Sequence, residues 1–400
     1  MSPSSTAPDL DAPPHVLRRA TLAVYLTFAV NGFAFASWAA RLPQLRDHLG
    51  LTPGRLGLVI LCVALGSLVS LPTTGFVVHR IGEGRTVAIM SSTLAAGLVL
   101  LGIGYHVGTL CVAAGFLVIG LGNGAWDVAM NVQGAHVERL IGRSIMPRFH
   151  AAFSIGTVIG AGISAGVVAL RLAVPEHLWI AATLIVATIP YVALHGFLSG
   201  VVEEEPGASR AAVFAAWRDP RTLLVGIFVM CMAFTEGTGN DWLSLASVDG
   251  YHKSNTVGAL TLACFLAAMT TGRWFGPALI DRFGRVWILR IFGLLALGGL
   301  ALVVYGHWYG IALLGAVMWG VGASLGFPVG ISAAADDPAM SAARVSVVAS
   351  IAYLAFLGGP PLVGFVGDHT GVLRSLTVAG ALLTIAILIS GACAPRRPPE

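Results

Sequence analysis

The stretch TVAIMSSTLAAGLVLLGIGY, residues 86–105, contains no charged side chain. A helix of about twenty residues rises about 30 Å, which matches the hydrocarbon core of a bilayer. The stretch therefore predicts a membrane-spanning helix. Similar apolar runs lie on both sides of it, and the chain as a whole is 56% hydrophobic and only 10% charged. These values favour an all-α integral membrane protein over a set of soluble domains.

Apolar runs bounded by charged residues, Pro or Gly mark twelve predicted spans. They lie near residues 20–41, 55–78, 86–105, 108–131, 149–170, 177–198, 222–246, 257–280, 286–305, 308–333, 344–366 and 372–393. The fifty glycines fit the same class, because Gly lets helices approach each other closely in lipid.

The distribution of basic residues predicts the orientation. With the N-terminus in the cytoplasm, sixteen of the 23 Lys and Arg residues fall inside, six fall outside and Arg273 lies within a span. This asymmetry follows the positive-inside rule. The polar, Pro-rich start lacks the apolar core of a signal peptide. We expect an inner-membrane protein with cytoplasmic tails at 1–19 and 394–400.

The chain divides into two related halves. The polar connection around Glu203-Glu204-Glu205-Pro206-Gly207 separates six spans from six, which predicts helix bundles at 20–198 and 222–393 joined by a cytoplasmic linker at 199–221. Gly120-Leu121-Gly122 and Gly320-Val321-Gly322 stand at an offset of 200. The halves therefore read as parallel repeats, and such repeats place a solute site at their interface near the bilayer midplane.

One loop carries a family signature. Asp281-Arg282-Phe283-Gly284-Arg285 resembles the D-R-x-G-R motif of the major facilitator superfamily. The counterpart in the first half reads His79-Arg80-Ile81-Gly82, without the usual Asp. The resemblance implies the twelve-helix major facilitator fold with two pseudo-symmetric bundles. It also implies that Arg80, Asp281, Arg282 and Arg285 take part in an inner gate.

Longer stretches narrow the resemblance. Residues 236–242 (EGTGNDW), 319–328 (WGVGASLGFP) and 344–348 (RVSVV) are similar to fucose-permease-related bacterial inner-membrane carriers. Asp127-Val-Ala-Met-Asn131 is similar to the E-x-A-x-N stretch of sugar–proton symporters in this group, whose acid is implicated in proton coupling. The first-span Asp of fucose permease corresponds to Ala39, which argues against fucose itself. The resemblance implies proton symport of a small polar, sugar-like solute.

Ionisable residues inside spans are costly and are the first candidates for function. Asn123, Asp127 and Asn131 recur every four residues and form one polar stripe on an apolar helix. The stripe predicts a wet helix face with Asp127 as a proton carrier. The alternative is that Asp127 only bonds an Arg or the backbone near the inner surface.

Span seven offers a second acid. Glu236 lies near its middle with Asn240 four residues on, and Gly237 and Gly239 weaken the helix between them. We expect this helix to open at a solute site, with Glu236 binding solute and exchanging protons. The alternative is a protonated Glu236 that bonds a neighbouring helix. Asp241, nearer the outer surface, is expected to be solvated.

Aromatic and amide residues complete the candidate site. Trp38 and Trp242 occupy matching places near the outer ends of spans one and seven, where membrane-interface Trp is common. Interface placement is the favoured interpretation, and stacking on a solute is the alternative. Arg273 is expected to extend its side chain toward the cytoplasm rather than to form a buried ion pair. Further candidates by depth and polarity are Asn31, Trp126 and Tyr353.

The sequence also weighs other functions. Basic residues stand singly or in pairs, which gives no nucleic-acid surface. No catalytic motif is present and the five cysteines lack metal-ligand spacing, so we expect neither an enzyme nor a metal or cofactor site. We expect a monomer whose partners are a small solute, protons and lipid. Efflux by proton antiport is a rival, although Phe116 and Gly160-Ala161 replace the Arg and Gly-Pro usual in family antiporters. A receptor without transport is a second rival.

Overall fold

Helices account for the twelve predicted spans. Within residues 13–142, 145–198, 209–337 and 340–395, which the computed structural model describes, twelve helical segments are long and apolar enough to cross a membrane. Each coincides with one predicted span. The described ranges contain no β-strand. The predicted all-α membrane fold is confirmed.

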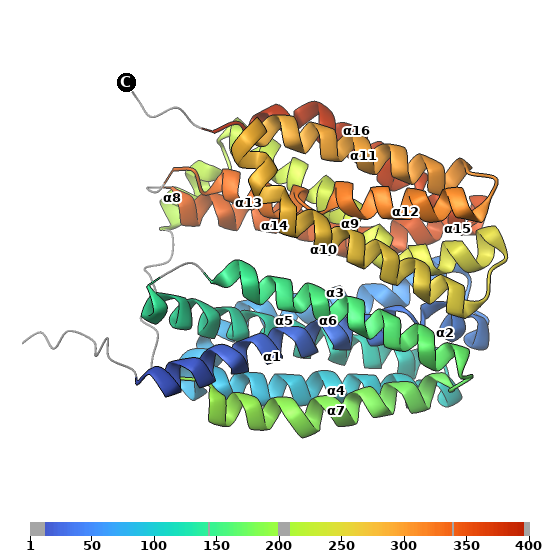
Figure 1. Ribbon diagram of the computed structural model, residues 1–400, viewed down its shortest axis with the longest axis horizontal. Coiled ribbons are helices and arrows are strands. Elements are labelled where there is room, and N and C mark those ends of the chain that lie inside the picture. The colour runs from blue at the N-terminus through green and yellow to red at the C-terminus, as the bar shows by residue number, and fades with distance from the viewer. Residues whose placement is uncertain (1–12, 143–144, 199–208, 338–339, 396–400) are drawn as a thin grey trace, which may run out of the picture.

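The helices form two bundles, which Figure 1 shows one above the other. The first contains α1 (Pro14–Ala39), α2 (Leu42–Leu49), α3 (Pro53–Ile81), α4 (Glu83–Val107), α5 (Thr109–Ile141), α6 (Met146–Ala169) and α7 (Val174–Gly196). The second contains α9 (Pro220–Tyr251), α10 (Asn255–Phe283), α11 (Arg285–Tyr305), α12 (Tyr309–Ala323), α13 (Gly326–Ala334), α14 (Ser341–Thr370), α15 (Val372–Ser375), α16 (Thr377–Ile389) and the 3₁₀ turn η1 (Ser390–Cys393). The short helix α8 (Arg210–Ala216) lies between them in the chain.

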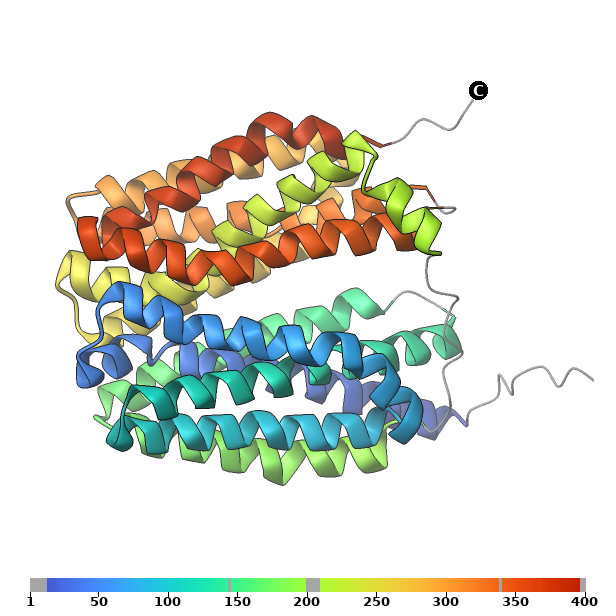
Figure 2. The ribbon, with the colours of Figure 1, turned by 180° about the vertical axis from the view of Figure 1, so that it is seen from behind.

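The two ends of the molecule differ. The start of α1 and the end of η1 lie at one end, here called the terminal end, and α2 lies at the opposite, far end (Figures 1 and 2). The bundles converge toward the far end. Residues 1–12 and 396–400 of the predicted tails and residues 199–208 of the predicted linker lie outside the described residues.

The helices extend beyond the predicted spans. The fourth span was expected to end near residue 131, whereas α5 continues to Ile141. The added turns carry His136, Glu138 and Arg139. A run of apolar residues measures only the part of a helix inside hydrocarbon, and a helix continues into the headgroup region wherever its backbone bonds persist.

Glycines at matching positions allow close helix packing in both bundles. A Cβ on Gly120 would enter the backbone of α3, and one on Gly320 would enter the backbone of α10. Likewise, a Cβ on Gly122 would meet the backbone of α4, and one on Gly322 would meet α11. These glycines let helix backbones touch, as expected for packing in lipid. The offset of 200 in the sequence is thus a repeat in the structure.

The loop that carries the family motif has the same backbone geometry in both bundles. Gly82 joins α3 to α4 with φ 83°, and Gly284 joins α10 to α11 with φ 86°. In this left-handed region a side chain is strained, so only Gly turns the chain at little cost. Each long helix pair is therefore joined by one glycine.

The expected helix opening in span seven is wrong, and a different span is interrupted. Helix α9 is continuous from Pro220 to Tyr251, through Gly237 and Gly239. Span ten instead breaks between α12 and α13, at Ser324 and Leu325. Pro328 explains the break, because a proline has no N–H for the carbonyl four residues earlier and its ring clashes with it. That carbonyl belongs to Ser324.

Candidate functional site

The helices that face the other bundle are defined by packing. In the first bundle α6, α1, α5 and α3 pack in that order, and in the second α14, α9, α12 and α10 do so. The outer members meet across the interface, with α3 against α14 and α6 against α10. Helices α1 and α5 therefore lie between these two lines of contact, where they face α9 and α12.

The polar stripe of α5 lies on this inner side. On α5, Gly122 meets α4 and Gly124 meets α3, whereas Asn123 meets α1 by accepting a 3.2 Å hydrogen bond from Asn31. Asp127 is one helical turn from Asn123 and its side chain is exposed. The Asn131 amide donates to the Asp127 carbonyl at 2.8 Å and to its carboxylate at 3.3 Å. The stripe thus presents a carboxylate to the space between the bundles.

Glu236 does not stand alone. Arg273 of α10 donates to the Glu236 carboxylate at 2.6 Å, and the two side chains are only 30% and 19% exposed respectively. The expectation that Arg273 extends to the cytoplasm is wrong. An opposite charge on the neighbouring helix neutralises the guanidinium inside the bundle, which removes the reason for the side chain to reach water.

Arg273 also forms a hydrogen bond with the interrupted span ten. Its Nε donates to the Ser324 carbonyl at 3.3 Å, the carbonyl that Pro328 leaves without a helical partner. A backbone break at membrane depth is tolerated where another group satisfies the freed polar atoms. Arg273 therefore links α9, α10 and the interrupted span ten.

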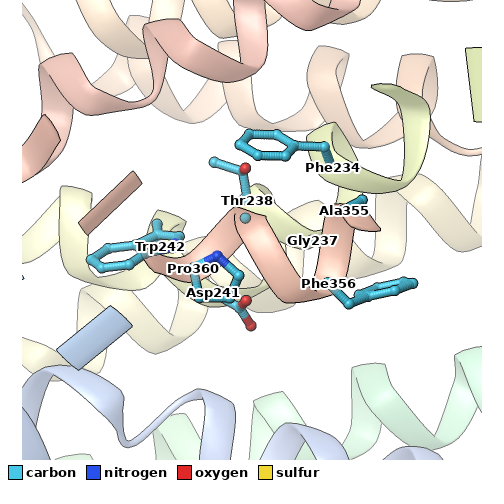
Figure 3. A pocket seen from close by; sticks show the side chains of 9 residues that line it. Phe234, Gly237, Thr238, Asp241, Trp242, Ala355, Phe356 and Pro360 are labelled. Carbon is cyan, nitrogen blue, oxygen red and sulfur yellow. The ribbon is translucent and has the colours of Figure 1, made fainter. Parts of the chain in front are cut away.

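A cleft of about 230 Å³, including its open mouth, lies between α9 and α14. Figure 3 shows its side chains. It is lined by Phe234, Gly237, Thr238, Asp241, Trp242, Ala355, Phe356, Gly359 and Pro360. Pro360 also abuts Gly57 of α3, where a Cβ would enter the Pro360 carbonyl. Contact between the bundles thus closes the cleft beside Pro360.

The two matching tryptophans are buried. Trp38 is 5% exposed and Trp242 is fully buried, so the favoured placement at the membrane interface is wrong for both. Trp38 packs edge-on against Phe35 and Phe116, with ring centroids 5.1 Å and 5.3 Å apart. Trp242 lines the cleft. Trp38 lies one residue before the end of α1, as expected, whereas Trp242 lies nine residues before the end of α9.

The sequence prediction missed Asp241. Its side chain lines the cleft beside Trp242, and no described residue forms a hydrogen bond or ion pair with its carboxylate. Solvation near the outer surface was expected instead. The available signal was the sequence itself, because an acid within a span is a candidate site by default.

The remaining candidates have separate surroundings. Trp126 is fully buried, and its indole nitrogen has no hydrogen-bond partner among the described residues. The same holds for the side-chain oxygen of Asn240. Tyr353 lies at the interface, where its hydroxyl donates to the Ala64 carbonyl of α3 at 2.6 Å. Tyr353 thus ties the two bundles together.

The predicted gate residues lie at the terminal end. Arg80, Asp281 and Arg282 are exposed there. Arg285 instead pairs with Asp336 of its own bundle at 3.0 Å. In the described ranges, none of these residues forms a hydrogen bond or ion pair with the opposite bundle. Their role in closing a gate stays a prediction.

Contacts between the bundles concentrate at the far end. Arg46 of α2 donates to Asp249 of α9, with one bond at 2.7 Å and a second, shorter one. The Asp368 carboxylate of α14 accepts from the backbone N–H of Gly54, in the first turn of α3, at 2.9 Å. These contacts, together with the Tyr353 bond, which lies nearer the middle of α3 and α14, are called the far-end latch below.

The fold and the paired bundles define a polytopic membrane transporter, and comparison with known proteins agrees. The family model of the Major Facilitator Superfamily matches residues 24–343. An uncharacterised MFS-type transporter of Yersinia pestis is 30% identical over 92% of this chain and 93% of its own length. The chain belongs to the major facilitator superfamily.

Solved structures share the fold. The nucleoside transporter NupG superposes with a TM-score of 0.75 at 16% identity, covering 94% of this chain and 98% of its own. The fucose:proton symporter FucP of E. coli superposes with a TM-score of 0.62 at 15% identity, covering 95% and 100%. At such identities the likeness concerns the fold alone.

Proposed function

We propose that this chain is a proton-coupled symporter that moves a small polar, sugar-like solute across the bacterial inner membrane by alternating access. The observation that carries the proposal is Asp127. Its carboxylate lies near the middle of a membrane helix, is exposed toward the second bundle, and has only Asn131 as a partner among the described residues. An acid in this position is costly without a function and suits proton exchange.

The arrangement of contacts supports alternating access. The far-end latch joins the bundles by polar bonds, whereas near the terminal end no such bond across the interface joins two described residues. Rocking of one bundle on the other would break the latch and close the terminal end. We assign the terminal end to the cytoplasm from the positive-inside count, with both tails and the linker 199–221 on that side.

The solute site is proposed between the bundles 20–198 and 222–393. The first bundle offers Asn31, Asn123 and Asn131 beside Asp127, and the second offers Glu236, Asn240, Trp242 and Tyr353. Amides and a carboxylate can bond hydroxyl groups, and an aromatic ring can stack on an apolar ring face. The nucleoside and fucose carriers of similar fold also act on polar ring solutes. We place the chain in the fucose-permease-related group as a functional monomer.

Arg273 refines the role of Glu236. The guanidinium supplies the opposite charge that an ionised Glu236 needs inside the membrane. Asp127 has no such partner among the described residues and is the better proton carrier. Glu236 then acts mainly in solute binding, coupled to the conformation of span ten through Arg273.

The test is transport in liposomes that contain the purified chain. A panel of sugars, nucleosides and drugs is offered with and without an imposed pH gradient, and accumulation is measured. Uptake of one polar solute class, driven by a gradient that is acidic on the side of the solute, is expected. Extrusion of solute against proton entry would favour antiport. Binding without any flux would favour a receptor and overturn the proposal.

A further inference from the structure

The cleft between α9 and α14 has an unusual composition. One carboxylate, that of Asp241, stands among three aromatic side chains, Phe234, Trp242 and Phe356. Figure 3 shows the carboxylate turned away from Phe234 and Thr238, with Trp242 and Phe356 on its two sides. Phe234 and Thr238 are buried and Asp241 is half-buried. The carboxylate therefore lies in a mostly apolar wall.

The charge of Asp241 is not balanced by its surroundings. Arg273, which bonds α9 from inside span eight, is already engaged by Glu236 and by the Ser324 carbonyl. In the described part of the chain Asp241 accepts no hydrogen bond. A charge held in low-dielectric surroundings is costly unless it is neutralised or paired. The missing partner is a positive charge.

A second buried group points to a ligand. The indole Nε1–H of Trp242 is fully buried and has no acceptor among the described residues. A buried donor without an acceptor costs about 1–3 kcal/mol. Trp242 lines the same cleft as Asp241. The cleft thus combines an anionic acceptor without a partner and the side chain of a tryptophan whose buried N–H also has none among the described residues.

Resting on the proposed transport function, we infer that this cleft is the subsite for a protonated amine and that the solute is an organic cation with an oxygen acceptor. The ammonium group bonds the Asp241 carboxylate and contacts the faces of Trp242 and Phe356. Aromatic faces attract such cations, best when both are shielded from water. The indole N–H of Trp242 donates to a hydroxyl or carbonyl oxygen of the same solute.

The lining favours an organic cation over a metal ion. In the residues that the structure describes, no group of three or more His, Cys, Asp or Glu side chains is placed to hold a metal. Hard cations take several oxygen ligands, whereas this cleft offers one carboxylate and aromatic walls.

The experiment measures binding to the full chain in lipid nanodiscs by calorimetry. The probes are the amines glucosamine and ethanolamine, both protonated at neutral pH, with glucose, N-acetylglucosamine and ethylene glycol as counterparts without charge. We expect at least one amine to bind at least about tenfold more tightly than its neutral counterpart. Asp241→Asn should remove that preference, and Asp241→Glu should retain part of it. Glu176→Gln, which removes an exposed acid at the far end, is the matched control and should change nothing.

The outcomes separate the inference from the proposed function. Failure of both amines to bind at millimolar concentration, tighter binding of a neutral counterpart, or amine binding unchanged in Asp241→Asn overturns the amine subsite. Competition by sodium ions as strong as competition by an organic amine would indicate an alkali-cation site. That result would also overturn the amine subsite. Proton-driven flux of a neutral solute in Asp241→Asn would leave the transport proposal intact. Amine binding without flux in liposomes would overturn transport and leave the subsite standing.

Discussion

The pair of Glu236 and Arg273 allows a prediction with a worked magnitude. Breaking a buried ion pair by removing one partner costs about 3–5 kcal/mol, whereas an exposed pair contributes about 0–1 kcal/mol. These side chains are 19% and 30% exposed, between the two cases. We therefore expect Glu236→Gln to destabilise the fold by about 2 kcal/mol, because it leaves a guanidinium without its counter-charge.

Removing Arg273 instead of Glu236 has a further cost. Arg273→Met removes the charge partner of Glu236 and also the donor to the Ser324 carbonyl, which adds about 1 kcal/mol. The double variant contains neither charge and should lose less than the sum of the two single variants. The expected coupling is about 1–2 kcal/mol, as found for residues in direct contact.

The assay is thermal unfolding of the four proteins in the same detergent, with solute binding measured in parallel. With losses of about 2 and about 3 kcal/mol for the single variants and a coupling of about 1–2 kcal/mol, the double variant should lose about 3–4 kcal/mol. The expected order of melting temperature is therefore wild type, then Glu236→Gln, then Arg273→Met, with the double variant equal to Arg273→Met or slightly below it. Solute affinity should fall in Glu236→Gln, because Glu236 adjoins the cleft through Gly237. Losses that simply add, together with normal solute affinity in Glu236→Gln, would refute this account of the pair.

Three other predictions concern coupling and gating. Asp127→Asn should abolish gradient-driven accumulation and preserve solute exchange, because the amide imitates a permanently protonated acid; unchanged accumulation in liposomes would exclude Asp127 as the carrier. Asp281→Asn should favour the state open at the terminal end and slow turnover, whereas His79→Asn should do little; equal effects on spin-label accessibility would contradict an unequal gate. Arg46→Gln removes the charge bonded to Asp249, so the population with an open far end should rise about tenfold, for a loss of about 1.4 kcal/mol. The measurement is the distance distribution between spin labels at the far end. If the latch were unimportant, this distribution would be the same in Arg46→Gln and in the wild type.

The fold was predictable because its signals are local. The length of an apolar run reports a membrane span, and the offset between Gly120 and Gly320 reports a repeat, without any knowledge of helix neighbours. Helix ends were less predictable, as the extension of α5 to Ile141 shows. The interruption of span ten was missed although Pro328 was visible, because the glycines at 237 and 239 drew the prediction to span seven.

The site was only partly predictable because its contacts join different helices. The spacing of Asn123, Asp127 and Asn131 placed them on one helix face without further information. The bond between Arg273 and Glu236 depends on which helices are neighbours, and spacing along one helix does not report that. Depth along the helix likewise misplaced Trp242 and Asp241, because depth does not tell whether a side chain faces lipid, headgroups or the bundle interior.

The far-end latch sets an energy scale for the transport cycle. Its few polar contacts each contribute on the order of 1–2 kcal/mol, so opening that end costs only a few kcal/mol. One proton that crosses a membrane potential of 100 mV releases about 2.3 kcal/mol. The energy of a single coupled proton is thus comparable with the strength of the latch. A carrier built in this way can be driven by ordinary membrane potentials, and a much stronger latch would hold it in one state.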